Sequence, residues 1–285
     1  MPALWSQENA RILNVRLINS LILISLLASC SAKRQSLSPS ANLDPDIDPV
    51  TGGAWYQPTV AATWQLQLTG TLNTTHVVDV YDIDLFDNSS AAIAALQGSG
   101  KKVICYFSTS YEDWRSDAAD FLSTSLGNNM DDWPGERWVD IRSQNVLDIM
   151  LARLDLAVTK GCDGVDPDNV NSYENDTGFS LTATDQLAFN RRIANEAHNR
   201  NLTIGLKNDG SQSAELVDYF DFELNEECHQ YGECDDLDIF ITNSKPVFNV
   251  EYTLTDAICP TALAENFRTI FLPKLLDGSS RDSCD

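Results

Sequence analysis

The sequence predicts a (β/α)8 barrel, because short strand-like runs alternate with helical stretches from Trp55 onward. Most of these runs are apolar on both faces, as parallel strands are when helices cover them. We expect eight strands, at residues 64–68, 77–81, 103–107, 162–166, 203–206, 220–224, 247–250 and 269–272. A doubly wound open sheet is the alternative, but the sequence has no phosphate-binding glycine motif to favour it.

The helices between the strands are predicted from their end signals. Serine and threonine cap helix N-termini, proline fits the first turn, and glycine often ends a helix. Such signals are a Ser89 cap before a helix that stops near Gly98, a helical pattern from Val146 to Gly161, a Thr182–Asp185 capping box, and Pro260 at the start of the last helix. Each of these helices falls between two predicted strands, as a barrel requires.

Residues 1–29 are predicted to be a lipoprotein signal peptide. The apolar run at 17–28 is shorter than the ~20 residues that span a membrane, and Arg11 and Arg16 precede it. It leads into Leu-Ala-Ser-Cys, which resembles a bacterial lipobox with Cys30 as the residue that is lipidated after cleavage. An ordinary secretory signal is the alternative.

Residues 30–52 are rich in serine, proline and aspartate, and are predicted to be a flexible tether to a barrel domain at 53–285. The mature protein would be exported, and either secreted or held to the cell envelope through its lipid alone. Because Ser31 rather than aspartate follows the cysteine, we expect the outer membrane if the host is a Gram-negative bacterium.

The cysteine count agrees with export. Six of the seven cysteines remain after Cys30, and an even number permits three disulfides. The expected pairs are Cys228–Cys234, which are close in sequence, Cys105–Cys162, on strands that a barrel makes neighbours, and then Cys259–Cys284. Two buried thiols are the alternative for the second pair.

Charge and spacing exclude several classes of partner. With 42 acidic and 19 basic residues, the chain carries a formal charge of −23 and has no basic face for nucleic acid. It has no CxxC or HExxH spacing, and an EF-hand reading of 166–177 fails at Val170, Asn171 and Thr177. We therefore expect no metal, no cofactor and no nucleic acid, and we expect a monomer.

Polar side chains gather where the predicted strands end. In a (β/α)8 barrel these ends converge on one face, where active sites lie. The residues concerned are Asp82, Asp84, Tyr106, Asp166, Asp168, Asn169, Lys207, Asn208, Glu226, Glu251 and Tyr252. A pair of carboxylates at such a face can hydrolyse a glycosidic bond, and nearby aromatic rings such as Trp114 can stack on sugars.

Eight segments in order carry a family resemblance: WQLQLTG, VVDVYDIDLFD, VICYFSTSYEDWR, WPGERWVDIRS, GCDGVDPDNVNSYENDTGF, GLKND, LNEEC and VFNVEY. Together they resemble the endo-α-1,4-polygalactosaminidases of glycoside hydrolase family 114. The resemblance implies a (β/α)8 barrel that hydrolyses α-1,4-linked galactosamine polymers with two acidic residues. Carried over to this chain, these are Asp168, after the fourth strand, and Glu226, after the sixth.

The expected roles follow from this pair. Asp168 would attack the anomeric carbon, and Glu226 would be the acid and base, with a pKa raised by burial or by Asp168. Asp166, Glu223 and Glu227 are the local competitors for these roles. The acidic chain suits a cationic glycan as its partner.

The other strand-end residues would bind substrate. Asp82 and Asp84 are expected to bind amino groups of the sugar, and Lys207 to orient a carboxylate or a hydroxyl. Two other functions stay open: a non-catalytic glycan-binding lipoprotein, and a hydrolase of a neutral polysaccharide.

Overall fold

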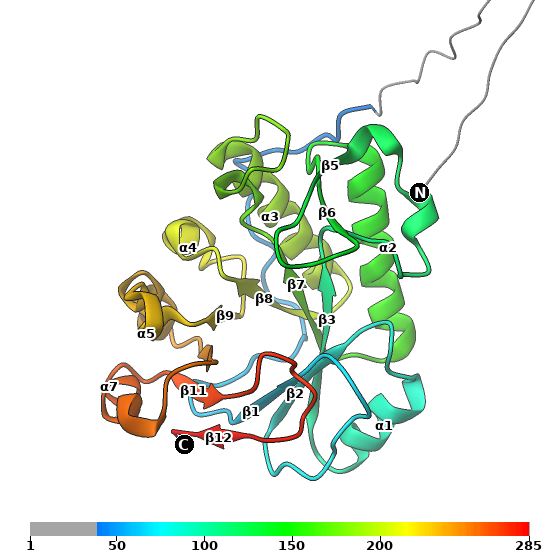
Figure 1. Cartoon of the computed structure of the whole chain (residues 1–285). Helices are drawn as coiled ribbons and strands as arrows, with labels where there is room; N and C mark the ends of the chain where they lie inside the picture. Colours follow the sequence, from blue (N-terminus) through cyan, green and yellow to red (C-terminus); the bar gives the residue numbers. More distant parts are fainter. Residues whose placement is uncertain (1–38, 285) are drawn as a thin grey trace, which may run out of the picture. The chain divides into compact units, whose positions relative to one another are not determined.

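The computed structural model describes residues 39–284, so the predicted signal peptide and Cys30 lie outside the described residues. The described chain forms a nine-stranded sheet that curls into a (β/α)8 barrel with helices outside it (Figure 1). In sheet order the strands are β1 (Trp64–Gln67), β2 (Val80–Asp84), β3 (Lys102–Ser108), β7 (Gly164–Asp168), β8 (Thr203–Lys207), β9 (Phe222–Glu226), β10 (Val247–Glu251), β11 (Arg268–Phe271) and β12 (Asp282–Ser283). All neighbours are parallel except β11 and β12. The predicted fold class is confirmed.

The segment after β11 closes the barrel. Among the described strands, β1 and β12 form the two edges of the hydrogen-bonded sheet. The amides of Leu68 and Thr69 donate to the carbonyl of Leu276, at 2.9 and 3.1 Å. Arg281 Nε donates to the carbonyl of Trp64 at 3.0 Å. These bonds join β1 to the C-terminal segment, where a closed barrel would have ladder bonds.

The described helices include the four that the sequence predicts, at residues 90–98, 144–160, 183–199 and 259–264. They are α1 (Ser90–Gly98), α2 (Gln144–Lys160), α3 (Ala183–Asn199), α4 (Ser213–Leu216), α5 (Cys228–Tyr231), α6 (Asp238–Thr242) and α7 (Cys259–Ala264). Ser89 accepts a bond from the amide of Ala92, and Thr182 and Asp185 form a reciprocal capping box. Gly161 ends α2 with a φ of 84°, which favours glycine.

Several strands lie two or three residues later than predicted. The run expected at 77–81 is the strand at 80–84, the run at 162–166 lies at 164–168, and the run at 220–224 lies at 222–226. Apolar patterning therefore stops these strands before the carboxylates at their ends, which are Asp82 and Asp84 in β2, Asp168 in β7 and Glu226 in β9. In this barrel those carboxylates belong to the strands: Asp82 and Asp84 are buried, and Asp168 and Glu226 are partly buried.

Side chains alternate between the barrel interior and the layer under the helices. The interior cluster includes Trp64, Leu66, Val80, Phe222 and Phe248, all buried. The outward side chains pack into a second and larger core with the helices. The apolar interior side chains lie in the earlier residues of their strands, so polar interior side chains are left for the last residues.

Residues 109–143 form an excursion between β3 and α2 that the sequence analysis did not predict. It contains a small antiparallel sheet in the order β4 (Tyr111–Glu112), β6 (Glu136–Val139), β5 (Leu126–Asn129). Figure 1 shows β5 and β6 close to the viewer, in front of the barrel strands. This sheet contributes one wall of the cavity described below.

Residues 39–52 do not behave as the flexible tether that their composition predicts. Asn195 on α3 accepts a bond from the amide of Val50 at 2.8 Å and donates to the carbonyl of Asp48 at 2.9 Å. The amide of Ala41 donates to the carbonyl of Arg142 at 2.7 Å. Contacts with the helical layer and with the excursion therefore fix this segment, and the predicted tether is corrected for its described part.

Within residues 39–284 the structure contains three disulfides, Cys105–Cys162, Cys228–Cys234 and Cys259–Cys284. These are the three expected pairs. Such bonds persist in oxidising compartments, which indicates a protein that folds outside the cytoplasm. In the described part of the chain, no helix combines the length and the apolar character needed to cross a membrane.

Candidate active site

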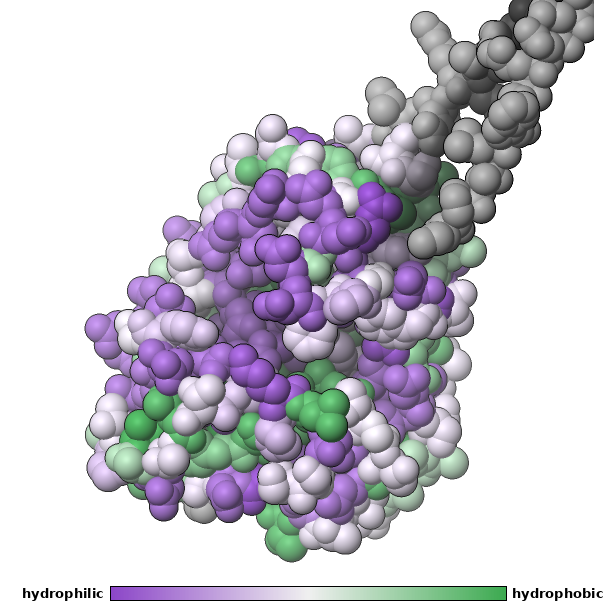
Figure 2. Space-filling model, in the orientation of Figure 1, coloured by the Kyte–Doolittle hydropathy of each residue, from purple (hydrophilic) through white to green (hydrophobic). Residues whose placement is uncertain are grey.

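A cavity of about 820 Å³ opens at the carboxyl ends of the barrel strands. Its walls come from the ends of β2, β3, β7, β8 and β9, from the excursion, and from residues 274–276. Eight acidic and three basic side chains line it, so the cavity attracts cations. Figure 2 shows a face dominated by hydrophilic residues and hollowed near its middle. The strand ends converge as the sequence predicts.

Asp168 and Glu226, the expected catalytic pair, line this cavity from the last positions of β7 and β9. Lys207 ends the intervening strand β8 and lies between them. Its Nζ is 3.5 Å from Asp168 Oδ1 and 3.6 Å from Glu226 Oε2. The lysine side chain is 1% exposed, whereas the two carboxylate side chains are 20% and 28% exposed. One buried ammonium group therefore holds both carboxylates at the mouth of the barrel.

Hydrogen bonds fix the orientation of Asp168. The Tyr106 hydroxyl donates to Oδ2 at 2.9 Å, and the backbone amide of Asn169 donates to Oδ1 at 2.8 Å. The Asn169 side chain is held in turn, because its Nδ2 donates to Ser108 Oγ at 2.8 Å. The carboxylate is therefore preorganised by β3 and by the first residue after β7.

Glu226 is held in the same way. The Tyr252 hydroxyl donates to Oε1, and Asn208 Nδ2 donates to Oε2 at 2.9 Å. Asn208 Oδ1 also accepts the backbone amide of Glu226 at 2.8 Å. The residues that directly follow the three strand ends, Asn169, Asn208 and Glu227, have φ of 63°, 53° and 62°. Such left-handed turns are uncommon for side-chain-bearing residues and cluster at functional sites.

The pKa of Glu226 is lowered, which corrects the expectation that it is raised. Burial acts to raise this pKa, but Lys207 and the hydrogen bonds from Tyr252 and Asn208 outweigh it. Burial also opposes the charge of Lys207, yet Asp168 and Glu226 raise the pKa of Lys207 well above its usual range. The free site therefore holds Glu226 as a carboxylate beside a permanent ammonium group.

Asp82 and Asp166 lie deeper in the barrel than the sequence analysis expected. They are 2% and 0% exposed, neither lines the cavity, and neither carboxyl has a hydrogen-bond partner among the described residues. Burial raises the pKa of Asp166 to about 7, and burial with Asp166 raises the pKa of Asp82 well above its usual range. Direct binding of sugar amino groups by Asp82 is therefore corrected, as is direct substrate contact by Asp166.

Asp84 is at the cavity wall but is already engaged. Its Oδ2 accepts a bond from Arg115 Nη2 at 2.6 Å, and its Oδ1 accepts the amides of Phe86 and Asp87, both at 2.8 Å. Arg115 also binds Glu112 in the excursion, Nε to Oε1, at 3.0 Å. Asp84 therefore ties β2 to the excursion, and the expectation that it binds sugar amines is corrected.

Glu251 faces away from the cavity. Its side chain is fully buried, and its Oε1 accepts a bond from the amide of His229 at 3.0 Å. Tyr252, the next residue, faces Glu226. Successive side chains alternate along a strand, so only one of these two neighbours can point inward. Direct substrate binding by Glu251 is corrected.

The excursion supplies cavity residues that sequence reasoning did not assign. Trp133, Trp138 and Glu136 line the cavity with Trp114, which was the one excursion residue expected to stack on sugars. Burial, together with Glu112 and Asp168, raises the pKa of Glu136 to about 7. The segment WPGERW contains three of these residues, but nothing in its local pattern shows that it folds over the barrel.

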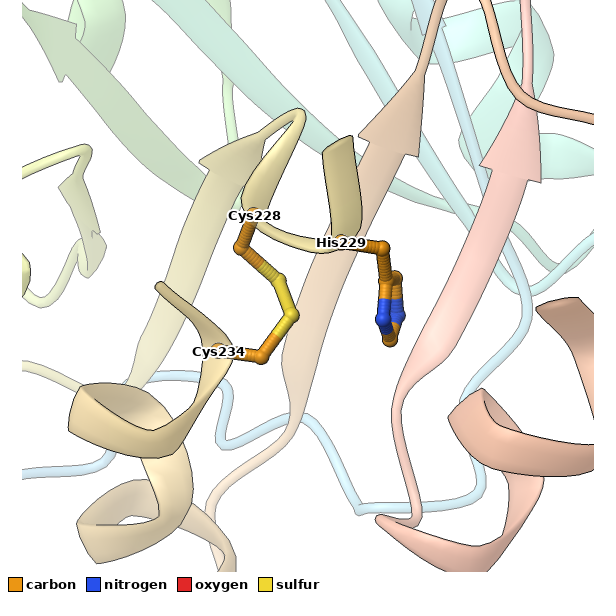
Figure 3. Close-up of side chains that lie close together, drawn as sticks. All are labelled: Cys228, His229 and Cys234. Carbon is orange, nitrogen blue, oxygen red and sulfur yellow. A yellow bond between two sulfur atoms is a disulfide. The ribbon is translucent and has the colours of Figure 1, made fainter. Parts of the chain in front are cut away.

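Cys228, His229 and Cys234 lie together after β9 in a grouping that resembles a metal site (Figure 3). The two sulfur atoms are joined in a disulfide, so they cannot act as thiolate ligands in this structure. Burial lowers the pKa of His229. The trio therefore offers no thiolate site, and its disulfide fastens the loop that follows Glu226.

Comparisons with known proteins show which family and fold this chain resembles. The sequence profile of glycoside-hydrolase family GH114 matches residues 48–285. The structure of Aspergillus fumigatus Ega3 in complex with galactosamine is similar, with 45% identity, a TM-score of 0.79, and 84% of this chain and 100% of that chain covered. The glycoside hydrolase domain of PelA from Pseudomonas aeruginosa shares the fold, at 12% identity and a TM-score of 0.62 over 76% of this chain and 96% of that one. No curated protein sequence matches significantly.

Proposed function

The chain belongs to glycoside-hydrolase family GH114, and we propose that it is an endo-α-1,4-polygalactosaminidase whose catalytic residues are Asp168 and Glu226. The observation that carries this proposal is the pair of carboxylates held by Lys207 at the mouth of an acidic cavity. Two carboxylates that flank a glycosidic bond are what its hydrolysis requires. An acidic cavity also suits a substrate whose amino groups are protonated, and galactosamine is the sugar bound in the Ega3 structure.

In the proposed mechanism, Asp168 attacks the anomeric carbon and forms a glycosyl-enzyme intermediate. Tyr106 and the amide of Asn169 orient this nucleophile. Glu226 protonates the leaving oxygen and then deprotonates the incoming water, so that configuration is retained. Tyr106, Asn169, Lys207, Asn208 and Tyr252 are the proposed polar contacts around the sugar at the point of cleavage.

The lowered pKa of Glu226 adds a condition to this mechanism. At neutral pH only a small fraction of the free enzyme holds the proton that the leaving oxygen must receive. We therefore expect kcat/KM to rise as the pH falls toward the pKa of Glu226. Lys207 is the main cause of this pH dependence, because it is the group that lowers the pKa of Glu226 most.

The test of function is to incubate the purified protein with deacetylated and with acetylated galactosamine polymers and to size the products. Rapid shortening of the deacetylated polymer to a range of oligomers is expected. Asp168→Asn and Glu226→Gln should each keep the fold, measured by circular dichroism, and lose nearly all turnover. Binding without cleavage by the wild-type protein would favour a glycan-binding role, and cleavage of neutral glycans alone would contradict the proposed substrate.

We also propose that the mature protein is anchored through a lipidated Cys30. The lipobox-like sequence before this residue supports the proposal, as do the three disulfides, which are typical of exported proteins. An anchored enzyme would act on polymer at the cell envelope.

A further inference from the structure

The hairpin loop between β5 and β6 carries an exposed tryptophan that the catalytic pair does not require. The Trp133 side chain is 59% exposed. Of the eight large apolar side chains that are exposed in residues 39–284, three line the catalytic cavity: Trp114, Trp133 and Leu275. Exposed aromatic side chains gathered at a cavity mark a ligand-binding surface. The excursion therefore extends the sugar-binding region beyond the two carboxylates.

A second cavity, of about 380 Å³, adjoins the first at this loop. Asn129, Met130 and Trp133 line both cavities and form the wall between them. Tyr111 on β4 adds a second aromatic side chain to the wall of the second cavity. The two cavities are therefore neighbours on either side of this loop, and a linear polymer that passes over the exposed Trp133 can reach both.

The loop that separates the cavities is held in a fixed shape. The amide of Glu136 donates to the carbonyl of Trp133, and the amide of Asp113 donates to the carbonyl of Gly135, both at 3.0 Å. Gly135 has a φ of 98°, and a Cβ atom there would lie 2.8 Å from Asp113 Oδ1 and 2.9 Å from Trp114. The positive φ favours glycine here, and the two hydrogen bonds hold the loop that forms a wall of the second cavity.

The charges of the second cavity suit a cation. Asp113 and Asp132 line it, are exposed, and do not line the catalytic cavity. Arg137 is the basic side chain in its wall, and its guanidinium donates to the carbonyls of Leu126 and Gly127. The arginine is thus committed to the backbone of β5, and the two carboxylates face the solvent.

From these observations we propose that the second cavity is a distal subsite that binds the same cationic galactosamine polymer away from the point of cleavage. Trp133 stacks on a sugar ring where the polymer crosses between the cavities, and Asp113 and Asp132 bind ammonium groups of the sugars beyond it. The inference rests on the proposed function for the identity of the ligand. Its consequence is a preference for long chains, because oligomers that fill only the catalytic cavity do not reach this subsite.

The test compares short galactosamine oligomers with the size-fractionated long polymer. The variant is Asp113→Asn with Asp132→Asn, and the control is Asp218→Asn with Asp256→Asn, two exposed residues that line neither cavity. Both variants change the net charge equally, so the control removes the effect of long-range attraction. We expect KM for the long polymer to rise roughly tenfold in the first variant only, with kcat on short oligomers unchanged. Trp133→Ala should also raise KM for the long polymer.

Binding measured by calorimetry in the Asp168→Asn background separates the two proposals. If wild-type protein cleaves no galactosamine substrate but the long polymer binds more weakly to the Asp113/Asp132 variant, the subsite stands and the catalytic assignment falls. If KM rises equally for short and long substrates, or rises equally in the control variant, the subsite proposal is overturned. Absence of polymer binding to the Asp168→Asn protein overturns both.

Discussion

Replacing Asp166 by asparagine should stabilise the protein at neutral pH and do so less at acidic pH. Asp166 is fully buried next to Asp82, and burial is the main cause that raises its pKa from 3.8 to about 7. In the unfolded chain the group is solvated and ionises near its ordinary pKa. As the pH rises from 4 to 7, the unfolded chain therefore loses a proton that the folded protein keeps, and unfolding becomes more favourable.

The magnitude follows from the width of this pH window. Each pH unit over which the two states differ by one proton changes the free energy of unfolding by about 1.4 kcal/mol. Across the window set by this pKa, the folded protein loses about 4 kcal/mol of stability from Asp166, and the loss is complete above pH 7. The asparagine side chain of the variant does not titrate, so the stability difference between variant and wild type should grow by this amount between pH 4 and pH 8.

Thermal unfolding at a series of pH values measures this change. For a chain of this size, about 4 kcal/mol corresponds to a shift of roughly 8–16 °C in Tm. The buried amide of the asparagine has its own cost, but that cost is the same at every pH and cancels in the trend. Asp82 also responds to the substitution, because Asp166 helps to raise its pKa, so the measured trend belongs to this buried pair.

Asp218→Asn, a substitution at an exposed residue, serves as the control for the change in net charge. A Tm difference between Asp166→Asn and wild type that stays constant from pH 4 to pH 8 would refute the reasoning. It would mean that Asp166 is ionised in the folded barrel and that Lys207 compensates its charge.

Three further predictions concern the catalytic pair, the Cys105–Cys162 disulfide and the lipid anchor. Lys207→Met removes the main cause of the lowered pKa of Glu226, so the alkaline limb of the kcat/KM profile should move to higher pH; an unmoved limb would show that Glu226 does not set it. Replacing Cys105 and Cys162 by alanine opens a loop with a sequence separation of 57 and should lower the free energy of unfolding by about 4 kcal/mol in denaturant titrations, whereas an unchanged midpoint would contradict this. Mass spectrometry of the native N-terminus should find acylated Cys30, and a soluble chain cleaved elsewhere would exclude the anchor.

Local patterns were sufficient for the barrel because the βα units carry their own short-range signals. Helix caps such as Ser89 and the Thr182 capping box are of this kind, and the structure uses them as expected. The prediction that residues 39–52 form a flexible tether was wrong because the contacts that fix this segment are long-range. Their composition favours solvation, but their backbone is satisfied by a side chain of α3, more than a hundred residues away, which composition does not reveal.

The strand-end residues were found as a group but could not be sorted from the sequence. Period-two alternation should have paired Asp82 with Asp84 and Asp166 with Asp168 on the interior face, and it does. What alternation leaves out is depth along the barrel axis. One step of two residues separates Asp168, which is partly exposed at the cavity, from Asp166, which is completely buried. The depth of each side chain depends on the residue at which its strand ends, and the apolar pattern placed that residue too early.

The same error in strand ends explains Glu251. If β10 ended at residue 250, as the apolar run suggests, Glu251 would begin a loop and be free to turn toward substrate. Because β10 continues through Glu251, the strand alternation still holds there, and it directs Glu251 outward and Tyr252 toward Glu226. The chemistry of this site therefore depends on strand length as much as on residue type. A strand that ended one residue earlier would release the carboxylate of Glu251 and remove the hydroxyl that holds Glu226.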